Sequence, residues 1–276
     1  MRNRAAFAFQ LGVTLSVAAF LVVPVAMSIL AGVTANFFVG VSSGLTLRWV
    51  AEVWRLYAST IGLSITIAIA CVAATLVLGV PAAYVLARRP GRIARAVEEV
   101  LTLPLAIPGL ALALALIITW GGFRNFRTGW GFILVGHVLY TLPFMVRAVL
   151  AVLSATAMRD LEEGAASLGA GFWTRLATVV LPNARGGILA GALMVLTLSV
   201  GEFNLTWMLH TPYTKTLPVG LADSYASMRL EIASAYTLVF FVMIVPLLVA
   251  MQAAGRPRRS ARAVEEVPSC NPQPSN

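Results

Sequence analysis

Charged residues are scarce in this chain of 276 residues. Asp, Glu, Lys and Arg together make up 11% of it, and hydrophobic residues make up 59%. Ordinary soluble domains are roughly a quarter charged. A chain of this size with so little polar surface cannot fold as a water-soluble globule. We therefore expect the lipid bilayer to be a large part of its solvent.

Lysine is nearly absent, since Lys215 is the only one. The phosphate-binding loop of a nucleotide hydrolase needs a glycine-rich backbone followed by Lys and Ser or Thr, and the chain has no such loop. The protein is therefore not expected to be an enzyme that hydrolyses ATP, and no cofactor is expected. Energy for any transport must come from a separate subunit or from an ion gradient.

Cysteine and histidine are also rare, with two of each. Cys71 lies within an apolar run and Cys270 lies near the end of the chain, so a disulfide is not expected. His137 and His210 have no partners at the spacings of metal ligands. We interpret both as hydrogen-bonded packing residues, and no metal site is predicted.

Long apolar runs dominate the rest of the chain. A membrane-spanning helix needs about 20 apolar residues, and six runs meet this need. They cover residues 11–32, 59–87, 101–122, 131–150, 186–209 and 232–253. The predicted fold is an all-α, polytopic membrane protein with six transmembrane helices. The first run is longer than the apolar part of a signal peptide, which favours a retained helix, although cleavage within residues 31–35 is an alternative.

The basic residues are distributed unevenly about these spans. Six are assigned to one side: Arg48, Arg55, Arg124, Arg127, Lys215 and Arg229. The other fourteen fall on the opposite side, and such an excess marks the cytoplasmic side of a membrane protein. Both termini are therefore predicted to be cytoplasmic. The net charge of +9 is explained by topology, so no nucleic-acid partner is expected.

Three parts are predicted along the chain. Residues 1–58 hold the first helix and an outer loop, and residues 59–254 hold five helices and a cytoplasmic loop at 154–185. The segment 255–276 is polar and contains Pro and Ser but no aromatic residue. Such a composition is typical of a disordered tail.

A polar insert at residues 161–182 interrupts the apolar pattern. Its composition favours two short helices, with a break at the glycines of residues 169–171 and an end at Pro182. Glu162 and Glu163 fall in a first helical turn, where the helix dipole favours carboxylates. Small residues, namely Ala165, Ala166 and Gly169, would allow another backbone to approach one surface closely. Apolar residues at the break and along the second helix would form a protruding knob: Leu168, Phe172, Trp173 and Leu176.

The insert resembles the cytoplasmic EAA loop of ABC-transporter permeases. That family's pattern is Glu-Ala-Ala, three residues, Gly, nine residues, and Ile-x-Leu-Pro. The matching positions are Glu163, Ala165, Gly169, Leu181 and Pro182, with Gly164 and Val179 as two small departures. Glycine in place of the first alanine should destabilise the first helix by about 0.5–1 kcal/mol.

The resemblance implies a fold, a function and partners. The fold would be the MetI-like ABC importer permease fold, and the chain would form half of a translocation path. The expected partners are a dimer of ATP-binding subunits docked on the insert, a second permease subunit that is identical or paralogous, and a periplasmic or extracellular solute-binding protein. The location would be the cell inner membrane, in contact with lipid.

Two further segments resemble one branch of this family. The run from Leu103 to Gly109 contains Pro104 and Pro108 one turn apart, and their missing donors predict a bend. The bend either lines the translocation path or only fixes packing. Glu202 is the single acid clearly inside an apolar run, in a Gly-Glu-Phe sequence that is also similar to the branch. A pathway-lining or structural role is favoured over a proton relay, because no second intramembrane acid or lysine accompanies it.

This branch serves polyamines, ferric iron, phosphonates and oxyanions, so the resemblance implies a small charged solute. Two other functions remain as alternatives. An ion-coupled secondary transporter would need inverted repeats and paired broken helices, and neither is apparent. A membrane anchor or assembly subunit would explain the apolar runs but not the insert.

Overall fold

The computed structural model describes residues 4–255 of the chain. The predicted tail, residues 255–276, lies almost wholly outside the described residues. The helices are α1 (Arg4–Ala31), η1 (Gly40–Ser43), α2 (Arg48–Arg88), α3 (Arg92–Ala106), α4 (Gly109–Trp120), α5 (Arg124–Thr128), α6 (Trp130–Leu153), α7 (Thr156–Ser167), α8 (Phe172–Arg175), η2 (Leu176–Val180), α9 (Leu181–Gly201), α10 (Asn204–Leu209), α11 (Leu217–Ala226) and α12 (Leu230–Gly255). Within the described part, extended pairing is limited to one bridge between Thr34 and Leu45. The all-α prediction is confirmed.

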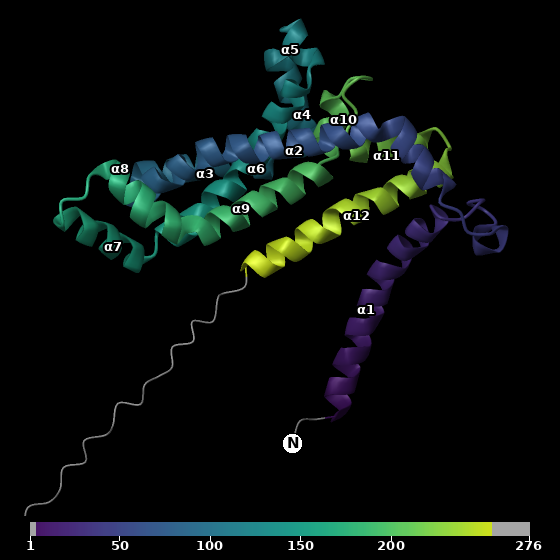
Figure 1. The fold of residues 1–276 in the computed structure, drawn as a ribbon, viewed down its shortest axis with the longest axis horizontal. Helices are drawn as coiled ribbons and strands as arrows, with labels where there is room; N and C mark the ends of the chain where they lie inside the picture. Colours follow the sequence, from purple (N-terminus) through teal and green to yellow (C-terminus); the bar gives the residue numbers. More distant parts are fainter. Residues whose placement is uncertain (1–3, 256–276) are drawn as a thin grey trace, which may run out of the picture.

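Three long helices, α2, α6 and α9, pack side by side, and α12 lies along α9 and α2 (Figure 1). The insert helices α7 and α8 lie at one end of this bundle and α11 lies at the other. Buried apolar side chains such as Met145, Val149 and Val195 fill the space between α2, α6 and α9. This cluster is one of several in the described part of the chain, and others lie where α4 and α10 meet α6 and where α11 and α12 meet α2.

Glycines allow α9 to approach α6 closely. A Cβ atom on Gly187 would stand 2.7 Å from the carbonyl oxygen of Ala148, and one on Gly191 would stand 2.9 Å from the sulfur of Met145. Small residues at helix contacts let backbones approach closely, and this packing replaces the hydrophobic effect inside a membrane. Close van der Waals packing at Gly187 and Gly191 therefore stabilises the contact between α6 and α9.

The first helix, α1, leaves the bundle and packs only near its end against α12 (Figure 1). A Cβ atom on Gly32 would stand 2.6 Å from the backbone of Ser234, which marks this contact. Most other side chains of α1 are exposed, including Phe9 and Phe20. An apolar helix with this exposure needs lipid or another membrane protein around it.

Five helices are long and apolar enough to cross a membrane, and a sixth span results if the bent pair α3 and α4 is counted as one. The six predicted spans thus correspond to five single helices and one bent pair, which takes the place of the third span. Helices α3 and α4 meet at an angle of 105°. Pro108 causes the break, because Ile107 takes the extended backbone that a residue before proline prefers (φ −91°, ψ 128°). Pro104 lies inside α3 without ending it.

The predicted fifth span, residues 186–209, is wrong at both ends. Helix α9 stops at Gly201, and the separate helix α10 begins at Asn204. At the other end, the insert runs into the membrane span as one helical stretch, Phe172–Gly201.

The second insert helix was expected to end at Pro182, and this expectation is wrong, because the helical stretch continues to Gly201. The backbone forms a π-helical turn over η2, in which the amide of Leu181 bonds to the carbonyl of Leu176. This turn shifts the hydrogen-bond register just before the proline. Pro182 then occupies the first turn of α9, where a missing donor is tolerated.

The predicted part boundary at residue 58 falls inside α2, one residue after a kink at Tyr57 (φ −127°, ψ 18°). Residues 48–58, predicted to belong to the outer loop, are thus the first part of α2. The division of the chain into parts remains a prediction.

Candidate functional site: the polar insert and the helix breaks

The two insert helices are separated by a glycine turn, as predicted. Gly169 has a φ of +84°, in the left-handed region that glycine adopts without strain. The amide of Gly169 donates a hydrogen bond to the carbonyl of Ala166 (2.9 Å), and the amide of Ala170 donates one to the carbonyl of Ala165 (3.1 Å). This pair of bonds is the Schellman pattern at the end of a helix. Gly169 is therefore the residue that permits the turn.

Apolar side chains protrude from this turn into the surroundings. Leu168 is 91% exposed and Trp173 is 77% exposed. Phe172 packs edge-on against Trp173 at 5.1 Å between ring centroids and also contacts Tyr84 at 6.0 Å. Leu168 and Trp173 stand outside the bundle, where a partner can reach them. We call Leu168, Phe172 and Trp173 the tip.

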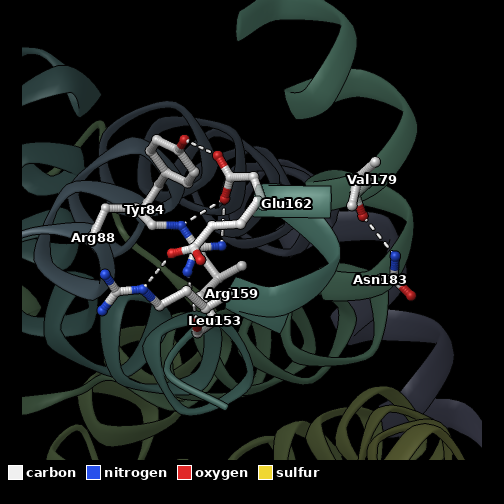
Figure 2. Close-up of polar contacts among 8 residues, drawn as sticks. Tyr84, Arg88, Leu153, Arg159, Glu162, Val179 and Asn183 are labelled. Carbon is white, nitrogen blue, oxygen red and sulfur yellow. Dashed lines mark hydrogen bonds and ion pairs between the residues drawn. The ribbon is translucent and has the colours of Figure 1, made fainter. Parts of the chain in front are cut away.

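Glu162 points inward and joins the insert to the bundle (Figure 2). Its carboxylate accepts a hydrogen bond from the hydroxyl of Tyr84 (2.6 Å) and another from Nε of Arg88 (2.6 Å). Nη2 of Arg88 lies 2.5 Å from the same carboxylate oxygen. Nη1 of Arg88 donates to the carbonyl of Leu153 (3.4 Å). The group Tyr84, Arg88 and Glu162, which we call the anchor, thus ties α7 to the end of α2.

Glu163 lies on the outer side of the same helix. It pairs with Arg159 at 2.8 Å, and both side chains are more than half exposed. The hydrogen bond that Arg159 donates to the Glu163 carboxylate raises the pKa of the Arg159 guanidinium. Of the small residues, Ala165 is half-buried and Ala166 is exposed. Gly164 has open space around it.

Leu181 and Pro182 lie at the start of α9, and Asn183 closes this turn by donating to the carbonyl of Val179 (2.7 Å; Figure 2). The sequence analysis placed Glu162 and Glu163 in a first helical turn, but α7 begins at Thr156 and neither residue lies in that turn; the anchor was not predicted. Neither Tyr84 nor Arg88 was among the predicted site residues. The Tyr84–Arg88 spacing of four residues on one helix face was the available signal.

A second feature lies where α4 and α10 begin. Side chains and backbone from α4, α6, α9 and α10 surround a partly open hollow of about 310 Å³, lined by Gly109, Tyr140, Thr197, Leu198, Gly201, Glu202, Phe203 and Asn204. Glu202 and the residue after Pro108 therefore line the same hollow. Pro104 is not among the lining residues.

Glu202 also supports the break itself. Its Oε1 atom accepts the amide hydrogen of Leu205 at 2.8 Å, which satisfies one of the free donors at the start of α10. An irregular backbone at membrane depth is tolerated where it faces protein or water. The carboxylate thus has a structural partner, and it faces a polar hollow.

Next to this break, His137 forms a buried polar link. Its Nδ1 atom lies 2.8 Å from the hydroxyl of Ser199 and its Nε2 atom lies 2.7 Å from that of Thr206. The prediction of a hydrogen-bonded packing histidine is confirmed, and the link joins α6 to α9 and α10. His210 contacts the carbonyl of Trp207 (2.8 Å). Within residues 4–255 no cluster of three or more His, Cys, Asp or Glu side chains could hold a metal ion.

Comparison with known proteins places these features in context. A family described as "Binding-protein-dependent transport system inner membrane component" matches residues 79–259. The putrescine transport system permease protein PotI of Escherichia coli K12 is 32% identical, with 72% of this chain and 74% of that protein covered. The molybdenum transport system permease protein ModB of Azotobacter vinelandii is 32% identical over 56% of this chain and 74% of that protein.

A third relative, the sulfate transport system permease protein CysW of Synechocystis, is 29% identical over 71% of this chain and 75% of that protein. Among solved structures, a chain of a bacterial alginate ABC transporter in complex with an alginate-bound periplasmic protein superposes with a TM-score of 0.70. It shares 16% identity, with 92% of this chain and 93% of that chain covered. This likeness concerns the fold.

Proposed function

Because the chain belongs to the family of binding-protein-dependent transport system inner membrane components, we propose that residues 161–182 are the element through which an ATP-binding subunit drives it. The chain is a non-catalytic permease subunit of an ABC importer. The carrying observation is the tip, an exposed apolar cluster at the end of the bundle that is fastened to the bundle by the anchor. Because the insert is fastened to the bundle, motion of a subunit docked on the tip would be transmitted to the long helices. A loosely attached loop would instead move without them.

Two rigid connections lead from the insert into the membrane. The anchor joins α7 to α2, and the stretch Phe172–Gly201 joins the tip to α9 without interruption. Closure of an ATPase dimer would move the insert, and both long helices would follow as rigid bodies. The glycine turn lets the two insert helices keep their angle while they move.

The family supports the remaining parts of the proposal. The protein would lie in the inner membrane with both termini in the cytoplasm, where the arginine excess places the insert. A second permease subunit, identical or paralogous, would complete the translocation path, and an external solute-binding protein would deliver the substrate. The hollow at Glu202 is proposed to line that path.

The substrate is proposed to be a small charged solute. The relatives are named for the transport of putrescine, molybdenum and sulfate. Putrescine is a cation and sulfate is an anion, so the sign of the charge differs among these relatives. Selection between these would rest mainly with the solute-binding protein. A search of the neighbouring genes for a solute-binding protein, followed by a ligand screen on that protein, would identify the solute.

The docking proposal is tested by changing the tip. Replacing Leu168 and Trp173 together by serine should abolish both co-purification of the ATP-binding subunit and uptake, because the apolar contact area is lost. Folding should be unaffected, since both side chains are exposed. The matched control is Tyr213→Ser, which removes an apolar side chain that is 95% exposed in the loop after α10. Retained ATPase binding and uptake in the double variant would show that the insert is not the docking element.

A further inference from the structure

A large open groove lies between the end of α2 and the start of α3. The two helices are joined by a tight connection at Pro90 and Gly91, so they diverge from one point. The groove has a volume of about 950 Å³ and is lined by Pro81, Ala82, Val85, Leu86, Arg89, Pro90, Gly91, Arg92, Ile93, Ala94 and Val97. Ligand pockets commonly measure about 300–1,000 Å³, so this groove has room for a large apolar molecule.

The walls of the groove are apolar and open to the surroundings. Val85 is 53% exposed on α2, and Ile93 and Val97 are 82% and 44% exposed on α3. Helix α3 packs against α6, and it has no fully buried residue. The exposed apolar face of α3 is therefore turned toward something other than this chain.

Arginines occupy one end of the groove. Arg89 directly follows α2 and Arg92 begins α3, and both line the groove and are exposed. In the described part of the chain neither side chain forms an ion pair or a hydrogen bond. The nearest acids on α3, Glu98 and Glu99, lie beyond the lining residues. An apolar slot thus ends in two free positive charges.

We propose that this groove binds an anionic phospholipid, with an acyl chain against Val85, Ile93 and Val97 and the phosphate between Arg89 and Arg92. The proposal goes beyond the docking function and rests on it for one point, the cytoplasmic placement of this end of the bundle. The cytoplasmic leaflet carries anionic lipid, and basic pockets between helices on that side hold such head groups. The charge pattern fits this occupant better than a second permease. A lipid phosphate neutralises both arginines, whereas a second permease would have to supply acidic partners for them.

The site borders the anchor. Tyr84 and Arg88 lie on the α2 face next to the one formed by Val85 and Arg89, and Arg88 holds Glu162 of the insert. A bound lipid would fix the divergence of α2 and α3 exactly where α2 receives the insert. Anionic lipid should therefore strengthen coupling between ATP hydrolysis and uptake.

The test uses the permease purified with its ATP-binding subunit in nanodiscs of dioleoyl phosphatidylcholine with increasing dioleoyl phosphatidylglycerol. Native mass spectrometry counts the phosphatidylglycerol that remains bound. Each basic side chain near an anionic surface contributes about fivefold in affinity, so Arg89→Gln with Arg92→Gln should weaken retention about 30-fold. The matched control, Arg55→Gln with Arg124→Gln, removes the same charge elsewhere and should leave retention unchanged.

A second variant tests the apolar slot. Ala94→Trp fills the groove and keeps both arginines, so it should also release the lipid. Equal retention of phosphatidylglycerol in the arginine variant and its control would overturn the proposal. So would equal retention of phosphatidylcholine, or cross-linking of Ile93→Cys to a second permease, which would make the groove a protein interface. Loss of the ATP-binding subunit from the wild-type complex with lipid still bound would contradict the docking function instead.

Discussion

At the scale of single residues, two adjacent carboxylates have opposite environments. Glu162 is 6% exposed and is held by Tyr84 and Arg88, whereas Glu163 faces outward beside Arg159. Removing one partner of a buried ion pair leaves a charge without compensation. An exposed pair one helical turn apart adds little. The two residues therefore have different consequences when they are changed.

We expect Glu162→Gln to destabilise the protein by about 3 kcal/mol, because Arg88 loses its counter-charge. Glu163→Gln should have a small effect on stability. The measurement is thermal unfolding of the purified protein in detergent. The double variant Arg88→Gln with Glu162→Gln should recover part of the loss, since no unpaired charge remains. Equal stability of the two single variants would contradict the anchor.

At the scale of elements, the insert depends on one backbone conformation. Gly169 takes a positive φ, and Gly164 lies within a helix with open space around it. Elsewhere, Glu202 caps α10, and Pro108 separates α3 from α4. Each break thus has a local cause in one or two residues.

The two glycines of the insert should respond in opposite ways to alanine. Gly169→Ala should raise the opening equilibrium of α7 about fivefold, because a left-handed residue with a Cβ atom costs about 1 kcal/mol. Gly164→Ala should lower it by a similar factor, since alanine favours a helix by about 1 kcal/mol over glycine. Hydrogen exchange of residues 156–168 measures both. Changes of the same sign in the two variants would refute this explanation of the turn.

At the level of the whole molecule, α10, which begins two residues after Glu202, lies far along the long helices from the insert helices α7 and α8 (Figure 1). The uninterrupted stretch Phe172–Gly201 runs from the tip to the hollow's edge. A rigid helix carries displacement over such a length without deforming. Motion of the insert should therefore change access to the hollow.

Access can be measured with Thr197→Cys, which lines the hollow. In a chain with Cys71→Ser and Cys270→Ser, a membrane-impermeant thiol reagent should label this position. The labelling rate should differ between the nucleotide-free and the vanadate-trapped transporter. Leu189→Cys, two turns away on α9, is exposed but lies outside the hollow, and should stay unlabelled in lipid. Equal labelling of both positions, or of Thr197→Cys in both states, would remove the hollow from the path.

Much of this architecture follows from local sequence. Apolar runs predicted the spans because burial of a helix in lipid depends on length and composition. Gly169 predicted its turn because only glycine adopts a left-handed backbone freely. The predicted helix end at Pro182 was wrong. The effect of a proline depends on the hydrogen-bond register of the preceding turn, and the π-helical turn at η2 changes that register.

An all-α membrane protein with an insert between its fourth and fifth spans follows from local sequence, since these properties depend on composition and on residues near one another. The tertiary structure alone decided that Glu162 meets Arg88, that Gly109 and Glu202 share a hollow, and that arginines close an apolar groove. Such contacts join residues as many as 93 positions apart in the chain (109 and 202). Their geometry depends on how whole helices cross, and a short stretch of sequence does not specify that.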